Sequence, residues 1–161
     1  MISCPATEIV ELSEMVGEDE DDAILLRELA STARVYLGSF EWSESVLETY
    51  YGLGVGGIVG VFLFHIVPSQ AEIDEWLWVV VGDLPPAYLV LDDAKTPVAA
   101  LQAYVSEMNE WVELAKLGQT SDEVIPVNVP ATPEFAAQLE GRLRMLEAVV
   151  IPKFMPTSDG D

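Results

Sequence analysis

An uncharged stretch from residue 49 to residue 71 limits the folds that this chain can adopt. Its inner part, residues 53–67, is almost entirely apolar at both odd and even positions. Such a pattern is typical of a strand at the centre of a sheet, buried on both faces. A membrane helix is the alternative and would need about 20 apolar residues. This stretch contains five glycines and His65, and no Lys or Arg flanks it to set an orientation. We therefore predict a central strand over residues 58–67.

The remaining patterns predict a sheet followed by helices. Short connections join the strand-like runs, and connections this short favour an antiparallel meander over parallel crossovers. The strands are predicted at 58–67, 72–81 and 88–91, with loops at 68–71 and 82–87 and a further edge strand or extended segment at 124–129. Helical spacing of apolar residues, with capping residues at the ends, predicts helices at 18–38, 42–51, 96–117 and 132–150, the last one stopping before Pro152.

This order of elements predicts an α+β fold, an antiparallel three- to four-stranded meander packed against two or three helices. A length of 161 residues favours one domain over residues 1–161. Residues 1–17 and 155–161 are expected to be poorly ordered. A homodimer is compatible with this fold, because sheet edges and helix faces can pair.

The charge of the chain is strongly one-sided. Twenty-eight acidic residues face seven basic ones, giving a net charge of −21, although half of the residues are hydrophobic. This combination predicts a folded domain with an acidic surface. Nucleic acid and anionic membranes would be repelled, so we expect neither as a partner, whereas a basic protein would be attracted.

The N-terminal segment and the single cysteine predict where the protein resides and what it lacks. Residues 1–22 contain eight acids and no Lys or Arg, the opposite of a basic signal-peptide start. We therefore expect a cytoplasmic protein of bacterial type. Cys4 alone can form neither an internal disulfide nor a cysteine-based zinc site. No cofactor and no metal are predicted. The acidic run 18–22 lacks the glycine and distal glutamate of a calcium loop, and is instead typical of a helix start.

His65 is the only histidine, so any catalytic scheme that needs an imidazole must use it. Its place in the most apolar strand favours a hydrogen-bonded core histidine over a catalytic base. The loop carboxylates Asp83, Asp92 and Asp93 are the other candidates for acid–base chemistry or ligand binding, and turn formation is the structural alternative for each.

Two further groups of residues are candidates for a binding surface. Trp76 and Trp78 lie two apart, so they share one face of a strand and could form an exposed platform, although packing under a helix is favoured. Glu107, Glu110 and Glu113 follow one side of the predicted helix 96–117, opposite its apolar stripe. They could face a basic partner or serve only solubility.

Part of the chain resembles a family of small bacterial proteins of unknown function. The likeness runs over residues 76–104, through Trp78, the Gly-Asp-Leu-Pro turn that begins at Gly82, Tyr88, the Asp92-Asp93 pair and the helix that starts at Pro97. Those proteins pair a tryptophan-rich strand with this turn and a proline-started helix. Immunity proteins of bacterial toxin systems are similar in size, acidity and α+β build, without a shared motif. Neither resemblance supplies a catalytic residue.

These observations favour a non-catalytic acidic module that binds another protein, of the immunity or inhibitor type. The alternative is a small-molecule-binding protein or hydrolase-like enzyme that uses the loop carboxylates with His65. That alternative predicts a concave pocket in which the carboxylates meet Trp76 or Trp78.

Overall fold

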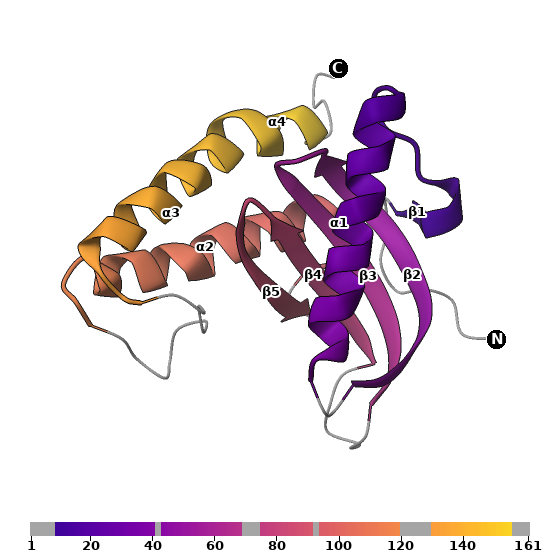
Figure 1. Ribbon diagram of the computed structural model, residues 1–161, viewed down its shortest axis with the longest axis horizontal. Coiled ribbons are helices and arrows are strands. Elements are labelled where there is room, and N and C mark those ends of the chain that lie inside the picture. The colour runs from indigo at the N-terminus through magenta and orange to yellow at the C-terminus, as the bar shows by residue number, and fades with distance from the viewer. Residues whose placement is uncertain (1–8, 41–42, 69–74, 92–93, 120–129, 156–161) are drawn as a thin grey trace. The chain divides into compact units, whose positions relative to one another are not determined.

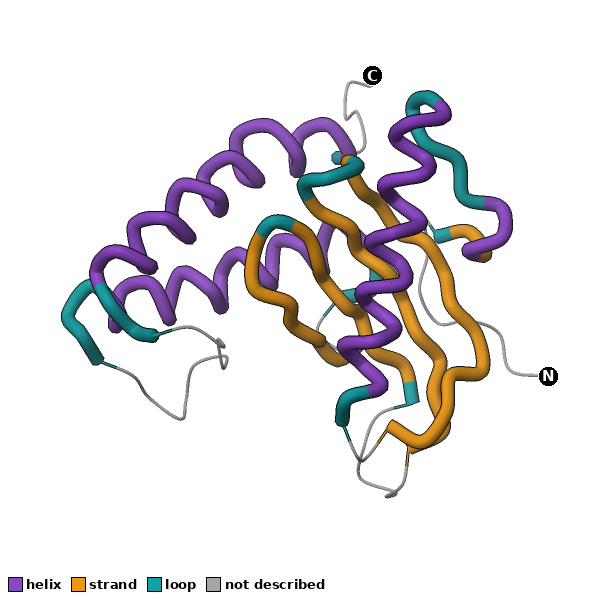
Figure 2. Tube along the Cα trace, in the orientation of Figure 1, coloured by secondary structure: helices purple, strands orange, loops and turns teal. Residues whose placement is uncertain are grey.

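The computed structural model describes residues 9–40, 43–68, 75–91, 94–119 and 130–155. The chain forms two compact units, Met1–Ala100 and Leu101–Asp161. The first contains a sheet and a long helix (Figures 1 and 2), and the second is helical where it is described. The expectation of one domain stays a prediction. No helix among the described residues is both long enough and apolar enough to cross a membrane.

The sheet of the first unit has five antiparallel strands in the order in which they occur along the chain. Its strands are β1 (Val10–Glu11), β2 (Ser43–Val55), β3 (Val59–Pro68), β4 (Trp76–Gly82) and β5 (Leu84–Val90). The α+β class and the antiparallel meander predicted from the sequence are confirmed, with one strand more than the largest number predicted. β1 and β2 are the two strands without a predicted counterpart, and the predicted segment 124–129 lies outside the described residues.

The apolar run forms the central strand, as predicted. β3 pairs with β2 on one side and β4 on the other. Phe62, Phe64 and Ile66 point to one face of the sheet, Val61 and Leu63 point to the other, and all five are buried. Hydrophobic residues at both parities are therefore explained by burial of both faces.

The predicted helix at 42–51 is wrong: this region lies in β2 from Ser43 onward, and Trp42 is outside the described residues. β2 is irregular, with register shifts between Val46 and Glu48 and between Tyr51 and Leu53. These shifts break the two-residue alternation by which a strand is recognised in a sequence. Pairing with the apolar β3 then outweighs the local helical preference.

The predicted loop at 82–87 is also wrong, because β5 begins at Leu84 and Asp83 alone separates it from β4. Gly82 makes this sharp corner possible. Its φ is +149°, and an added Cβ would overlap the carbonyl oxygen of Ile58. The N–H of Asp83 donates to that same oxygen at 2.9 Å. Pro85 and Pro86 are tolerated in β5 because it is an edge strand.

One long helix covers one face of the sheet (Figure 1). α1 (Glu20–Gly38) begins after the N-cap Asp19, whose side chain accepts from the N–H of Asp22. Its start and end agree with the prediction. Four small or aliphatic side chains of α1 pack with apolar side chains of β3 and β4 into one core. The α1 members are Leu26, Ala30, Ala33 and Leu37, and the strand members are Phe62, Phe64, Ile66, Leu77, Val79 and Val81.

Asp22 connects the start of α1 to the hairpin between β2 and β3. Its Oδ1 accepts from the N–H of Gly56 at 2.7 Å, and its Oδ2 accepts from the N–H of Glu18 at 2.9 Å. The sequence predicts only a favourable dipole effect for the acidic run. One of its carboxylates also satisfies two backbone donors, a structural role.

α2 (Pro97–Ala115) starts as predicted, with the Thr96 hydroxyl accepting from the N–H of Ala99 at 3.1 Å. It ends in a Schellman arrangement, in which Gly118 has a φ of +70° and donates to Ala115 while Gln119 donates to Leu114.

The second unit continues with α3 (Pro133–Met145), a π-helical segment η3 (Leu146–Val150) and α4 (Ile151–Phe154). Thr132 caps α3, as predicted, by accepting from the N–H of Phe135. The predicted stop before Pro152 is wrong. Pro152 occupies the first turn of α4, where its missing N–H is tolerated, and the π turn before it changes the hydrogen-bond register.

Some of the predicted features fall partly or wholly outside the described residues. These are Cys4, the segment 124–129 and most of the C-terminal tail. Within residues 1–17, which are expected to be poorly ordered, the structure places β1 and a short 3-10 turn, η1 (Leu12–Glu14).

Candidate binding site

The two tryptophans share a face of β4, as expected, but their environments differ. Trp78 is fully buried, and its indole N–H donates to the carbonyl of Ala94 at 2.9 Å. It therefore joins β4 to the segment before α2 and offers no exposed surface. Trp76 is half-buried and lies stacked on His65, with ring centroids 4.0 Å apart and an interplanar angle of 5°.

The three candidate loop aspartates do not form a described site. Asp83 is exposed at the β4–β5 corner, where its backbone N–H donates a hydrogen bond to the carbonyl oxygen of Ile58. Asp92 and Asp93 are outside the described residues. The concave pocket that the enzyme alternative predicts is therefore not among the described features.

The three candidate glutamates lie on α2 in the second unit. Glu110 and Glu113 are exposed, and Glu107 is half-buried. Glu113 lies 3.5 Å from the Nζ of Lys116. Lys116 also donates to Glu140 of α3 at 2.9 Å. This hydrogen bond raises the pKa of Lys116 and lowers the pKa of Glu140, so the pair stays charged and joins two helices of this unit.

His65 lies between two carboxylates on the face of the sheet that carries Trp76. Its Nδ1 is 3.2 Å from Oε1 of Glu48 on β2, and its Nε2 is 3.3 Å from Oε1 of Glu75. The His65 side chain is 14% exposed, so it is neither a core residue nor a freely exposed one. Both ring nitrogens of His65 therefore face carboxylates, and neither faces one of the candidate aspartates that the structure describes. Tyr50 lies beside Trp76, with ring centroids 6.1 Å apart.

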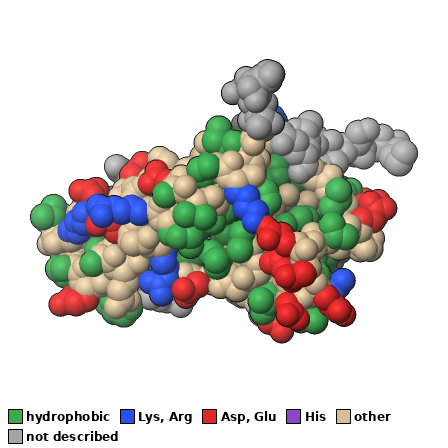
Figure 3. Space-filling view, turned by 90° about the horizontal axis from the view of Figure 1, so that it is seen from above, with side chains coloured by type: hydrophobic (Ala, Val, Ile, Leu, Met, Phe, Trp, Pro, Cys, Tyr) green, Lys and Arg blue, Asp and Glu red, His purple; other side chains and the backbone are tan. Residues whose placement is uncertain are grey.

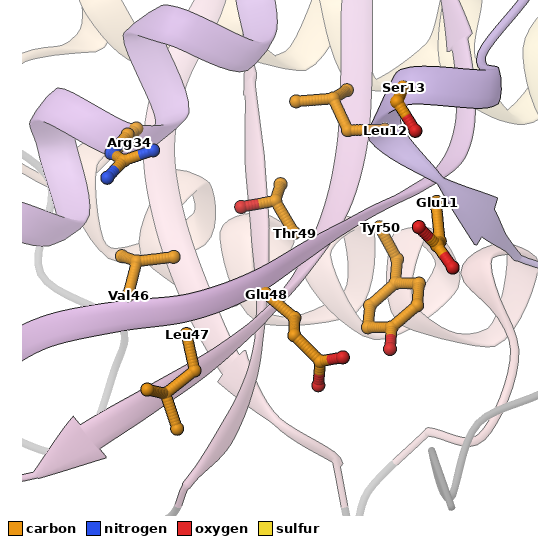
Figure 4. Close-up of a pocket in the computed structure, with 9 residues that line it drawn as sticks. All are labelled: Glu11, Leu12, Ser13, Arg34, Val46, Leu47, Glu48, Thr49 and Tyr50. Carbon is orange, nitrogen blue, oxygen red and sulfur yellow. The ribbon is translucent and has the colours of Figure 1, made fainter.

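An open groove of about 320 Å³ runs along the outer edge of β2, next to this histidine cluster. Glu48 and Tyr50 line the groove (Figure 4). Glu48 also contacts His65, and Tyr50 also contacts Trp76. The groove is lined by Glu11, Leu12, Ser13, Arg34, Val46, Leu47, Glu48, Thr49 and Tyr50. We call it the β2-edge groove.

The groove exists because β1 is very short. β1 pairs with β2 only at Tyr50 and Tyr51, after which the chain turns into η1 and leaves the sheet. The outer edge of β2 before Tyr50 therefore has no paired strand among the described residues. The register shift next to Leu47 leaves that side chain 55% exposed.

The two sides of the groove differ in charge. Glu48 and Glu11 lie on the side of β2 that carries His65, with Tyr50 between them, whereas Arg34 of α1 and Thr49 lie on the other side (Figure 4). Arg34 is exposed, and it forms no ion pair or side-chain hydrogen bond with any residue that the structure describes. The groove thus has an acidic wall and a wall with one cation.

Glu11, Arg34 and Glu48 are not among the residues predicted from the sequence, because a helix is predicted at 42–51. The run Val46-Leu47-Glu48-Thr49-Tyr50-Tyr51 is rich in β-branched and aromatic residues, which is the available signal for a strand. In the described part of the chain, no group of three or more His, Cys, Asp or Glu residues could hold a metal ion.

No protein-family model, curated protein or solved structure matches this chain. The resemblance over residues 76–104 therefore stays a prediction. In the structure, two of its motif residues, Trp78 and Gly82, have structural roles in the sheet of the first unit.

Proposed function

We propose that this chain is a non-catalytic module that binds a basic protein through the β2-edge groove. The single observation that carries the proposal is an open, acidic groove beside an incompletely paired strand in a chain of net charge −21. An excess of negative charge steers a basic partner toward the surface and speeds association, and an unpaired strand edge supplies a place to bind.

The distribution of acids on the first unit supports this direction of attraction. Figure 3 views the molecule from the end at which α1 begins, and acidic side chains gather in one stretch of that face. The acids at the start of α1 are Glu18, Asp19, Glu20, Asp21 and Asp22. Their field adds to that of Glu11 and Glu48 in the groove, so a cation approaching this unit is attracted before it makes contact.

The contacts of His65 support binding over catalysis. The carboxylates of Glu48 and Glu75 lie at its two ring nitrogens, and Trp76 covers one ring face. A histidine held in this way stiffens the acidic wall of the groove. An inhibitor or immunity-type protein that blocks a basic toxin is the form of this function that the size, acidity and α+β build favour.

The test compares two charge reversals that change the net charge equally. Glu48→Lys alters the groove, whereas Glu28→Lys alters an exposed acid of α1 that does not line it. The probe is a fluorescent lysine-rich peptide, with a glutamate-rich peptide of equal length as its counterpart. Affinity is measured by anisotropy between about 20 and 300 mM salt, a range over which screening of surface charges increases strongly.

We expect the wild type to bind the lysine-rich peptide with salt-dependent affinity and not to bind the glutamate-rich one. Glu48→Lys should weaken binding about tenfold, and Glu28→Lys no more than about twofold, because interaction energies fall with distance and screening. If both reversals weaken binding equally, the acidity acts only as a general coat and the groove is not the site. Absence of binding at the lowest salt would refute the function itself.

A further inference from the structure

The outer edge of β2 is only partly paired among the described residues. β2 extends from Ser43 to Val55, whereas β1 covers it only at Tyr50 and Tyr51. Among the described residues, the rest of the sheet pairs with the opposite, inner edge of β2. An edge strand presents N–H and C=O groups that can pair with a strand from another chain.

The two walls of the β2-edge groove would contact alternate side chains of such a strand, and the walls differ in charge. Successive residues of an added strand point to opposite faces of the sheet. One set would meet Glu48 and Tyr50, and the other set would meet Val46, Thr49 and Arg34. The first wall attracts cations and the second repels them.

We infer that an extended segment of the basic partner adds to the sheet at the outer edge of β2, with Lys or Arg at every second position. This inference rests on the proposed function and names its binding mode. The basic residues face Glu48 and Glu11, and the alternate residues are uncharged, small or β-branched, or carry a carboxylate opposite Arg34. The stretch from Ser43 to Thr49 spans about 20 Å at ~3.3 Å per residue, which accommodates a segment of about seven residues.

A second copy of this chain fits the edge less well. Antiparallel pairing of two β2 edges would bring Glu48 and Glu11 of both copies into one groove, and like charges that face each other across strands destabilise pairing. Each copy also carries a net charge of −21. The bulge beside Leu47 further interrupts regular pairing between two folded edges, as bulges commonly do on exposed strands. A free extended segment can adapt to the bulge.

The experiment uses the full chain and three kinds of synthetic peptide. The first alternates Lys with Val or Thr over eight residues, and the second has the same composition with its lysines in one block. The third kind is a pair of alternating peptides, N-methylated either at every odd or at every even residue. Methylation removes backbone donors on one edge of the peptide strand only, so each member of the pair is the control for the other.

We expect the alternating peptide to bind at least about fivefold more tightly than the block peptide at low salt. One methylated peptide should lose about tenfold or more in affinity, and the other should retain the affinity of the parent. Isotope-edited infrared spectra of a ¹³C-labelled alternating peptide should report β-structure in the bound state.

Three results would overturn the inference, each in a recognisable way. Equal binding of all lysine peptides would leave the proposed function standing and exclude strand addition. Failure of every lysine peptide at low salt would refute both the function and the inference. Concentration-dependent dimerisation in sedimentation velocity, strengthened by Glu48→Gln because the facing charges are removed, would assign the edge to a second copy instead.

Discussion

The β4–β5 corner and the outer edge of β2 belong to the same sheet, but only the corner is conspicuous in the amino-acid sequence. The corner contains Trp78, Gly82 and Asp83, a run of unusual residues that draws attention in the sequence, and its described contacts are internal. The edge contains Glu48 among ordinary strand residues, with Arg34 of α1 lining the same groove, and it is open to solvent. In this protein the conspicuous residues allow a sharp turn of the backbone, whereas the candidate site lies at a strand edge with no paired strand among the described residues.

The strongest test of the structural role of the corner is to substitute Gly82. In Gly82→Ala the new Cβ would overlap the carbonyl oxygen of Ile58 and lie 2.7 Å from the Cα of Val59, at a φ of +149°. We expect the free energy of unfolding to fall by about 3 kcal/mol or more, because strain and overlap add. Urea unfolding followed by far-UV circular dichroism measures the change.

Gly118→Ala is the matched control for this substitution. Gly118 also has a positive φ, +70°, but a Cβ added there would have no atom within 4 Å beyond its own chain neighbours. Its loss should therefore be limited to about 1–2 kcal/mol, the cost of placing alanine in the left-handed region. Equal losses for the two variants would show that the corner makes no special demand.

The second test sets Trp78 against Trp76, which lie on the same face of β4. Trp78→Phe removes the donor to the buried carbonyl of Ala94, and we expect a loss of about 1–3 kcal/mol in unfolding free energy. Trp76→Phe retains an aromatic ring against His65 and should lose less than about 1 kcal/mol. Thermal unfolding of both variants makes the comparison, and a larger loss at Trp76 would reverse our assignment of structural and surface roles.

The third test asks which acids are structural and which belong to the surface coat. Asp22→Ala leaves the N–H groups of Gly56 and Glu18 without their acceptor, so we expect a loss of about 1–2 kcal/mol. Asp21→Ala makes the same change in charge at a neighbouring position and should stay within about 0.5 kcal/mol of wild type. Similar losses of unfolding free energy for the two variants would show that Asp22 has no structural role beyond that of the other surface acids.

How far the sequence predicts this molecule depends on whether a signal is local. The apolar run of β3, the caps Thr96 and Thr132 and the α1 boundaries are read from neighbouring residues, and the structure confirms them. β2 is not predicted because its bulges disturb the alternation of residues between the two faces of the strand. Its pairing with β3 also cannot be inferred from neighbouring residues in the sequence. The groove could not be predicted at all, since it depends on where β1 stops pairing.

A fourth test concerns two half-buried tyrosines that pack against the core between α1 and the sheet, Tyr51 of β2 and Tyr36 of α1. Burial, and secondarily the charge of Asp22, raises the pKa of Tyr51 to about 12, and burial raises the pKa of Tyr36 to about 12 as well. An unfolded tyrosine ionises near pH 10, so between pH 10 and 12 the unfolded state releases protons first and stability falls as the pH rises. Below pH 10 this contribution to stability is fully present.

Absorbance at 295 nm measures the ionisation, and urea unfolding at pH 9, 10 and 11 measures the stability. Tyr51→Phe should reduce the alkaline loss of stability, and Asp22→Ala should lower the pKa of Tyr51, because it removes the nearby negative charge. Ionisation of all five tyrosines near pH 10 in the folded protein would contradict the burial of Tyr51 and Tyr36.

The smallest effect on stability is expected where the largest effect on binding is proposed. Glu48→Gln keeps the size and shape of an exposed side chain on β2 and removes only the charge beside His65. Exposed ion pairs contribute little, so the free energy of unfolding should change by no more than about 0.5 kcal/mol. The same variant removes a carboxylate from the acidic wall, so its affinity for the alternating lysine peptide should fall several-fold and depend less on salt. A residue that costs little stability but much affinity is what separates a binding surface from a structural corner such as Gly82. If Glu48→Gln instead lowers the free energy of unfolding as much as Gly82→Ala does, the carboxylate–histidine cluster is part of the structural framework, and the edge of β2 is not the binding site.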